Sequence, residues 1–285
     1  MAEKPFFIIL LSILIILFIA YQSLTGSPTT QAQLFYEEGS VLLNNKAIQE
    51  TTQLNQGDTI TTGADGLATI ILYESITISL NPNTKITIKE LIKKHPKLTQ
   101  KGGETWNTFT NIAGVESYSI SAGNSLATVR GTAFSLTEEK IITTEGEVEY
   151  QRDQEKFTVR KGEVVERIVQ KSKKRQITEV ERIIVQKQEE RTIKQLRALR
   201  EREIEKNVLL KKVVTSQLDM TDEQFYEHLR EVDNSGQDID TLLEKSLVKS
   251  ESLEKIARIT KEIQKKKGTQ TERHEKDIPR RERIR

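Results

Sequence analysis

The charged residues of this 285-residue chain are divided unequally between its two parts. Residues 1–165 contain 14 Lys and Arg and 18 Asp and Glu, whereas residues 166–285 contain 30 and 24. Nearly half of the second part is therefore charged, a composition that favours solvated helix or disorder over a packed core. The first part can bury a core of ordinary domain size. We expect one globular domain followed by a charged region.

An apolar run begins close to the start of the chain and extends from Phe6 to Ala20, and the next four residues carry the segment on to Leu24. As a helix, Phe6 to Leu24 would span roughly 28 Å, close to the ~30 Å of a bilayer's hydrocarbon core. The alternative is a cleaved signal peptide, whose apolar stretch is usually shorter and ends at a small-x-small site; Ala20-Tyr21-Gln22 is a poor match to such a site. We predict a retained transmembrane anchor over residues 5–24, preceded by a stub of residues 1–4.

The flanking charges predict the orientation of this anchor. Lys4 and the terminal amine precede the run, and no Lys or Arg follows it until Lys46. The positive-inside bias therefore favours a cytoplasmic N-terminus with the bulk of the chain outside the cell membrane, and the reverse topology is the alternative. Residues 25–33, rich in Ser, Thr and Gln, are predicted to form a linker. Because the chain has no cysteine, an extracytoplasmic domain would be held together by its core alone.

Residues 34–167 show short stretches of apolar alternation, for instance Ile76 to Leu80, Lys85 to Lys89 and Phe157 to Val159. Alternation with β-branched residues is typical of half-buried strands. Turn signals such as Asp65-Gly66 and Lys161-Gly162 interrupt these stretches at short intervals. The pattern predicts an all-β domain, a sandwich, roll or jelly-roll.

Several blocks of this segment, in order, resemble the FecR domain, a family named after a membrane regulator of iron-citrate uptake. Leu54 to Thr62 is similar to the family's G-D-x-I-x-T motif, and Ala127 to Leu136 resembles its A-x-V-R-G-T-x-F-x-V core. Thr144 to Val148 and Val159 to Glu163 resemble two closing glycine turns. Tyr73-Glu74-Ser75 departs from the family, which usually has a glycine in that turn.

The resemblance implies a set of signature residues, most of which we interpret as structural, in turns, close-packed backbone or the core. They are Gly57, Asp58, Thr62, Gly66, Ala127, Val129, Arg130, Gly131, Thr132, Phe134, Gly146, Gly162 and Glu163. For Arg130 we favour a structural role, as a fork of donors that ties strand ends together, over a contact with a partner. Trp106 has the same two interpretations: a core or edge residue, or a partner contact.

No grouping of residues typical of catalysis or of metal or cofactor binding is visible in the sequence. His95 is the one histidine of the β-rich segment, cysteine is absent, and no phosphate-binding loop or dinucleotide fingerprint occurs. We therefore predict no catalytic, metal or cofactor site, and a protein that is not an enzyme.

Residues 168–267 are predicted to be a charged helical region, and residues 268–285 a basic disordered tail. Capping-box patterns at Thr178 and Thr221 predict a long helix over residues 178–215 and a shorter one over 222–232. Further helices are predicted over 239–248 and 253–265, with breaks at Gly236 and Gly268.

The long helix lacks a continuous coiled-coil seam. A heptad that begins with Ile193 and Leu196 places Arg200 and Glu203 in the next seam positions. We therefore favour a solvated helix, or a helix docked on the β-domain, over an oligomerising coiled coil. A homo-oligomer through the helical tail remains the alternative.

The resemblance suggests signalling across a membrane, because FecR-like regulators act on a sigma factor through an N-terminal cytoplasmic region. Four residues before the anchor cannot form that region, so we do not expect the anti-sigma activity. We expect a single-pass protein whose extracytoplasmic FecR-like domain is a non-catalytic module for protein interaction or sensing, with envelope proteins as partners. The alternative is a structural envelope protein whose tail self-assembles or tethers to wall polymers. Nucleic acid is not expected as a partner, because the predicted topology places the tail outside the cell.

Overall fold

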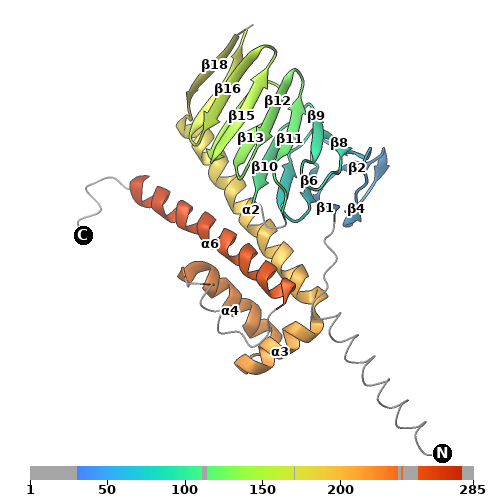
Figure 1. Ribbon diagram of the computed structural model, residues 1–285, viewed down its shortest axis with the longest axis vertical. Helices are drawn as coiled ribbons and strands as arrows, with labels where there is room; N and C mark the ends of the chain where they lie inside the picture. Colours follow the sequence, from blue (N-terminus) through green and yellow to red (C-terminus); the bar gives the residue numbers. More distant parts are fainter. Residues whose placement is uncertain (1–30, 111–113, 170, 237–238, 240–249, 278–285) are drawn as a thin grey trace, which may run out of the picture. The chain divides into compact units, whose positions relative to one another are not determined.

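The computed structural model describes residues 31–110, 114–169, 171–236, 239 and 250–277, which fall into two compact units (Figure 1). We call residues 29–192 the β-domain, since they hold all the described strands and the start of the first described helix. We call residues 193–285 the helical unit. This compact unit extends beyond residue 167, the predicted end of the FecR-like domain, by another strand and the beginning of a helix.

The strands of the β-domain are short and follow one another closely along the chain. Their bounds are β1 Ala32–Glu38, β2 Val41–Leu43, β3 Lys46–Ala47, β4 Thr52–Gln53, β5 Thr59–Thr62, β6 Leu67–Leu72, β7 Ile76–Leu80, β8 Lys85–Glu90, β9 Lys97–Lys101, β10 Thr105–Phe109, β11 Tyr118–Ala122, β12 Ser125–Val129, β13 Ala133–Leu136, β14 Lys140–Glu145, β15 Glu147–Arg152, β16 Glu155–Arg160, β17 Glu163–Ile168 and β18 Lys171–Gln176.

These strands form two nine-stranded sheets. One sheet, which we call sheet A, has the order β18-β17-β14-β13-β10-β7-β6-β1-β4, and the other, sheet B, has the order β16-β15-β12-β11-β9-β8-β5-β2-β3. The described neighbours pair antiparallel, except that β9 and β11 are parallel. The prediction of an all-β domain is confirmed, and the structure shows that it has two sheets.

The core of the β-domain lies between the two sheets and uses the apolar face of most of the strands. Ile70 and Phe134 from sheet A and Ile86 and Tyr118 from sheet B belong to one buried cluster. The rings of Tyr118 and Phe134 lie 6.4 Å apart. Alternation places these residues inward because successive side chains of a strand point to opposite faces.

The β6–β7 hairpin forms although its turn lacks the glycine of the FecR pattern. Tyr73 and Glu74 both have positive φ, 49° and 55°, and the Ser75 N–H donates to the Leu72 carbonyl at 3.0 Å. Tyr73 is buried in the core cluster, and its hydroxyl donates to the Leu91 carbonyl at 2.6 Å. Burial of the Tyr73 ring therefore stabilises a turn with positive φ, a conformation that glycine adopts at lower cost.

Four helices have described bounds: α2 Glu179–Lys206, α3 Val208–Leu218, α4 Asp222–Ser235 and α6 Glu251–Asp277. Both capping boxes are present. The Thr178 hydroxyl accepts from the Glu181 N–H, and the Glu181 carboxylate accepts from the Thr178 N–H. In the same way the Thr221 hydroxyl accepts from the Gln224 N–H, and the Gln224 side-chain oxygen accepts from the Thr221 N–H. The prediction of one long helix over residues 178–215 is wrong at its C-terminal end. The helix α2 stops at Lys206, because Asn207 is not helical. The predicted break at Gly268 is also wrong, because α6 continues through it to Asp277.

The first turns of α2 cover the outer face of sheet A within the β-domain. Val185 packs with Trp106, Ile142 and Val164, and Trp106 is only 2% exposed. One turn and a half later, the guanidinium of Arg191 donates to the Glu37 carboxylate and to the Ala68 carbonyl. Docking of the helix on the β-domain, the favoured expectation, holds for this part of α2.

The helical unit buries charged residues at the positions that interrupt the heptad. Arg200 and Glu203 are each 1% exposed, beside buried apolar residues such as Leu196 and Ile204. The Arg200 guanidinium pairs with the Asp233 carboxylate of α4 through bonds of 2.6 and 3.1 Å. Residues 193–277 therefore include a packed interior, contrary to what their charged composition favours.

No helix in the described part of the chain is long and apolar enough to cross a membrane. The segment from Phe6 to Leu24, predicted to be the anchor, lies outside the described residues, as do the predicted stub, most of the linker and the last eight residues of the tail.

Candidate interaction site

The signature block forms the turn between β12 and β13. Ala127 and Val129 precede the turn and Phe134 follows it, and all three lie in the core cluster. The Thr132 carbonyl accepts a hydrogen bond of 2.8 Å from the Phe109 N–H, which fixes the far side of the turn. Core packing of the residues before and after it, and a hydrogen bond from β10, thus fix the position of this turn.

Other signature residues hold turns elsewhere in the β-domain. The Asp58 carboxylate accepts from the Asn55 N–H at 2.8 Å and from the Asn44 amide at 2.7 Å. The Thr62 hydroxyl donates to the Asn81 carbonyl at 2.7 Å. A Cβ on Gly66 would lie 2.1 Å from the Ser40 carbonyl oxygen, so no other residue fits there without a shift of backbone.

The closing glycine turns are equally constrained. Gly146 has φ +69°, and a Cβ there would lie 2.8 Å from the Gly131 carbonyl oxygen. Gly131 and Gly162 also have positive φ, as does Gly57 near the start of the pattern. Glu163 accepts from the Arg160 N–H and from Lys174; burial opposes its ionisation, but these two donors hold its pKa below the ordinary value.

Arg130 differs from the rest of the signature set, because its side chain is exposed. Within the described residues its guanidinium makes no hydrogen bond, and its one described interaction is electrostatic, with Glu116. The favoured expectation for Arg130, a fork that ties strand ends together, is therefore not what the structure shows. The turn presents this guanidinium to solvent.

Two loops lie beside Arg130 and add further charges. The N–H groups of Glu116 and Ser117 donate to the Lys94 carbonyl at 3.0 and 3.1 Å, so the loop before β9 and the loop before β11 are bonded to each other. Lys94 Nζ lies 2.6 Å from the Glu116 carboxylate. In the same loop before β9, the side chain of Ile92 is 55% exposed. We call Ile92, Lys94, His95, Glu116 and Arg130 the signature patch.

The electrostatics of the signature patch keep Glu116 ionised. The hydrogen bond and charge of Lys94 lower the pKa of Glu116, with smaller contributions from His95 and Arg130, and the same pair raises the pKa of Lys94. Two permanent cations, Lys94 and Arg130, thus share one carboxylate. A guanidinium with free donors binds a carboxylate in bidentate fashion, so the patch suits an acidic group on a partner.

The structure also brings Ser117 and Glu116 to His95, a grouping that the sequence did not reveal. His95 Nδ1 lies 2.7 Å from the Ser117 hydroxyl, and Nε2 lies 3.6 Å from Glu116. A serine nucleophile needs a carboxylate that orients the histidine in a site protected from water. Here His95 and Glu116 are half exposed, and Glu116 lies closer to Lys94 than to His95. The arrangement is one surface hydrogen bond, between His95 and Ser117, beside a longer contact with Glu116.

Trp106 is buried under α2, so its ring is not available to a partner in this structure. Of the two interpretations of Trp106, its burial supports the core residue over the partner contact. No group of three or more His, Asp or Glu residues among the described residues is arranged to hold a metal ion.

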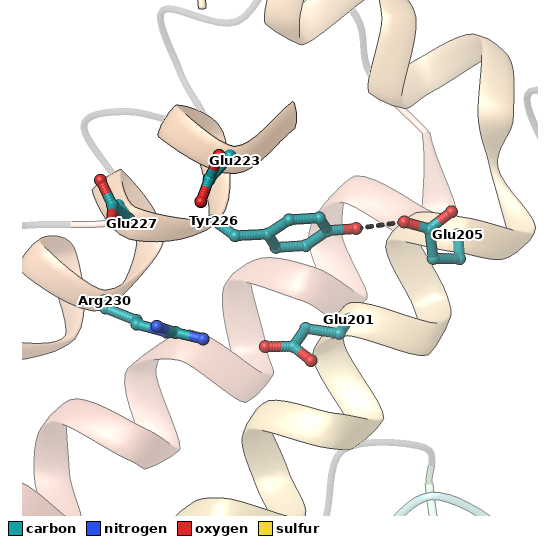
Figure 2. A pocket seen from close by; sticks show the side chains of 6 residues that line it. All are labelled: Glu201, Glu205, Glu223, Tyr226, Glu227 and Arg230. Carbon is teal, nitrogen blue, oxygen red and sulfur yellow. Dashed lines mark hydrogen bonds between the residues drawn. The ribbon is translucent and has the colours of Figure 1, made fainter. Parts of the chain in front are cut away.

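The helical unit contains an open groove of about 380 Å³ between α2 and α4, shown in Figure 2. Its lining is predominantly acidic: Glu201, Glu205, Glu223, Tyr226, Glu227 and Arg230. The Tyr226 hydroxyl donates to Glu205 at 2.5 Å; burial and this carboxylate raise the pKa of Tyr226 to about 12. Lys211 binds Glu205 at 2.8 Å, so this carboxylate is already engaged within the unit.

The family comparison agrees with the signature residues described above. Residues 58–165 match the FecR protein family. The match covers the blocks from Asp58 to Val165, and the predicted resemblance is confirmed there. The helical unit and β1 to β4 lie outside the matched part of the FecR-like domain.

Two solved structures show a limited similarity to this chain. Two crystal structures of a protein from Parabacteroides distasonis, described as a "putative anti-sigma factor", are similar to this chain at 14% sequence identity with a TM-score of 0.37. The alignment covers 41% of this chain and 59% of that one, so the chain spans less than two thirds of the protein it matches. No curated protein matches the sequence significantly.

Proposed function

We propose that this chain is a single-pass membrane protein whose extracytoplasmic FecR-like domain is a non-catalytic module that recognises another envelope protein. The observation that carries the proposal is Arg130. It belongs to the most specific block of the FecR pattern, yet its side chain is exposed and forms no hydrogen bond within the described residues. A residue that does not hold the fold in this block is available for recognition.

The signature patch has the composition of a small recognition surface. Arginine is enriched at protein interfaces, and an exposed aliphatic residue such as Ile92 adds apolar area beside it. The two positive charges of Lys94 and Arg130 outnumber the one negative charge of Glu116. We therefore propose that the partner presents an acidic segment. The membrane location and orientation rest on the apolar run from Phe6 to Leu24 and on Lys4 before it.

The test is a pull-down with the full chain from detergent-solubilised membranes, comparing wild type with Arg130→Ala. We expect an envelope protein to be recovered with the wild type and lost with Arg130→Ala. Arg160→Ala is the matched control, since Arg160 is an exposed arginine of the same domain, 3.8 Å from Glu147. Equal recovery with both variants would contradict the assignment of Arg130.

A second measurement tests the proposed location separately. Protease added to intact cells should digest the FecR-like domain from outside, while a cytoplasmic marker protein stays intact. Protection of the domain until the cells are lysed would contradict the proposed orientation but would leave the role of Arg130 open to the pull-down.

A further inference from the structure

The first turns of α2 carry an aliphatic stripe that faces solvent. Val180, Ile183 and Ile184 are 69%, 50% and 43% exposed. Their spacing of three and four residues places them on one face of the helix. Another face is occupied, because Val185 packs against Trp106 in the β-domain. This helix thus has one apolar side that is buried and a second that no described residue covers.

Charged residues extend the stripe at both ends. Lys187 lies one turn beyond Ile183 and Ile184, is exposed, and has no hydrogen bond or ion pair within the described residues. Glu179 lies beside Val180 at the start of the helix, also exposed, with a loose contact of 3.6 Å to Arg182. The face therefore runs from an acidic residue through three aliphatic residues to a basic residue.

We propose that this stripe is the contact between two copies of the chain, with the two α2 helices antiparallel. A two-fold axis beside Ile183 and Ile184 places these side chains against one another. The same axis brings Lys187 of each copy to Val180 and Glu179 of the other. A surface that is complementary to itself in this way fits a two-fold symmetric contact.

The charges favour the antiparallel arrangement over the parallel one. In a parallel two-fold pair each residue meets its own copy, so Lys187 would face Lys187 and Glu179 would face Glu179. Like charges placed in this way destabilise a helix pair, whereas the antiparallel pair places opposite charges together twice. The inference goes beyond the proposed recognition role and does not depend on it.

Three aliphatic side chains per copy make a small contact, so the dimer should be weak in dilute solution. Attachment of both copies to one surface would raise their effective concentration and strengthen the pairing without any new contact.

Cysteine cross-linking tests the proposal directly, because the chain contains no cysteine of its own. In the full chain, Ile183→Cys should form a covalent dimer on mild oxidation, several-fold more than Leu126→Cys, a comparably exposed control on β12 that lies outside the signature patch. Val180→Cys and Lys187→Cys should each cross-link poorly alone but efficiently with each other when the two variants are co-expressed.

Two results would overturn the proposal. Efficient cross-linking of Val180→Cys with itself, and little with Lys187→Cys, would show parallel pairing. If Ile183→Cys cross-links no better than the control, the stripe makes no contact with a second copy. If it cross-links only to another protein, the stripe binds that protein instead.

Sedimentation gives an independent readout: Ile184→Glu should shift the full chain from dimer to monomer, and unchanged Trp106 fluorescence would show that α2 stays docked. A wild-type chain that is already monomeric at high concentration would count against the dimer.

Discussion

The β-domain and the helical unit of this chain hold their interiors together in different ways. The core between the sheets of the β-domain is one cluster of aliphatic and aromatic side chains, and each described ion pair of this domain, such as Lys97 with Glu90, keeps at least one partner partly exposed. The interior of the helical unit contains charges: Arg200 pairs with Asp233, and Lys255 with Glu203 at 2.5 Å. A charge-rich sequence can thus form a packed unit if its charges pair inside it.

The two interiors should respond differently to substitution. Loss of an apolar side chain leaves a cavity, whereas loss of one partner of a buried ion pair leaves a charge without compensation. Replacement of both partners by apolar residues can be neutral. The chain offers two convenient probes, since its single tryptophan, Trp106, reports on the β-domain under α2, while far-UV circular dichroism follows the helices.

The largest effect is expected in the apolar core. Phe134→Ala should lower the free energy of unfolding of the β-domain by about 3–5 kcal/mol, because the fully buried ring packs against Tyr118 and its loss leaves a cavity. Urea titration followed by Trp106 fluorescence measures the change. Ile92→Ala, an exposed control, should change it by less than about 0.5 kcal/mol. A cost for Phe134→Ala as small as that of the control would contradict the role assigned to the core.

The next effect is expected in the helical unit. Asp233→Ala should destabilise this unit by about 3 kcal/mol, because it leaves the guanidinium of Arg200 buried without its carboxylate. Circular dichroism should show the helices unfolding at lower urea, while the Trp106 transition stays in place.

A double variant separates charge pairing from packing at the same position. Asp233→Leu combined with Arg200→Met should recover most of the lost stability, since neither buried charge remains. If the double variant is as unstable as Asp233→Ala, the loss comes from packing around the pair, and the distinction drawn between the two interiors fails.

A smaller effect is expected where α2 joins the β-domain. Glu181 accepts bonds of 2.7 and 2.8 Å from Arg175 and one from Lys140, and these donors hold its pKa well below the usual range. Glu181→Gln should cost about 2 kcal/mol near neutral pH, as a charge-assisted network is lost. The exposed Glu179→Gln serves as the control and should cost less than about 0.5 kcal/mol.

The pH dependence of this effect follows from the sign of the shift. Because the pKa of Glu181 is lower in the folded than in the unfolded state, its contribution is complete above about pH 4.3, the ordinary pKa of glutamate, and is lost as the pH falls towards the folded value. Urea titrations of wild type and Glu181→Gln, followed by Trp106 fluorescence, should converge below about pH 4. A difference that stays constant down to pH 3 would show that the ionised carboxylate is not the cause.

The sequence predicts the β-domain well because its signals are local. Alternation over Ile76 to Leu80 fixes which side chains face the core, and glycines such as Gly66 stand where a Cβ would collide with backbone. The capping boxes at Thr178 and Thr221 are also local, and both are confirmed. Features that depend on three or four neighbouring residues can be found without a structure.

The features that the sequence did not reveal depend on residues far apart in the chain. Arg200 and Glu203 interrupt the heptad, and their partners, Asp233 and Lys255, are 33 and 52 residues away. Likewise, nothing near Arg130 in the sequence shows that its side chain is exposed without a hydrogen bond, and the meeting of His95 with Ser117 depends on two loops that lie together. Tertiary pairing decides these cases.

The smallest effect is expected at the surface charges of the β-domain, and it completes the comparison of the two interiors. Lys97→Met removes an exposed ion pair with Glu90, so the free energy of unfolding should change by less than about 0.5 kcal/mol, because both groups remain hydrated. The matched variant in the helical unit is Lys255→Met, which leaves Glu203 ionised in a buried position and should shift the helical transition clearly to lower urea. Added salt should abolish the small effect at Lys97 and leave the effect at Lys255, since buried pairs are poorly screened. Equal effects at the two lysines would mean that the charges of the helical unit are hydrated like surface charges, and its interior would then depend on Leu196, Ile204 and their apolar neighbours alone.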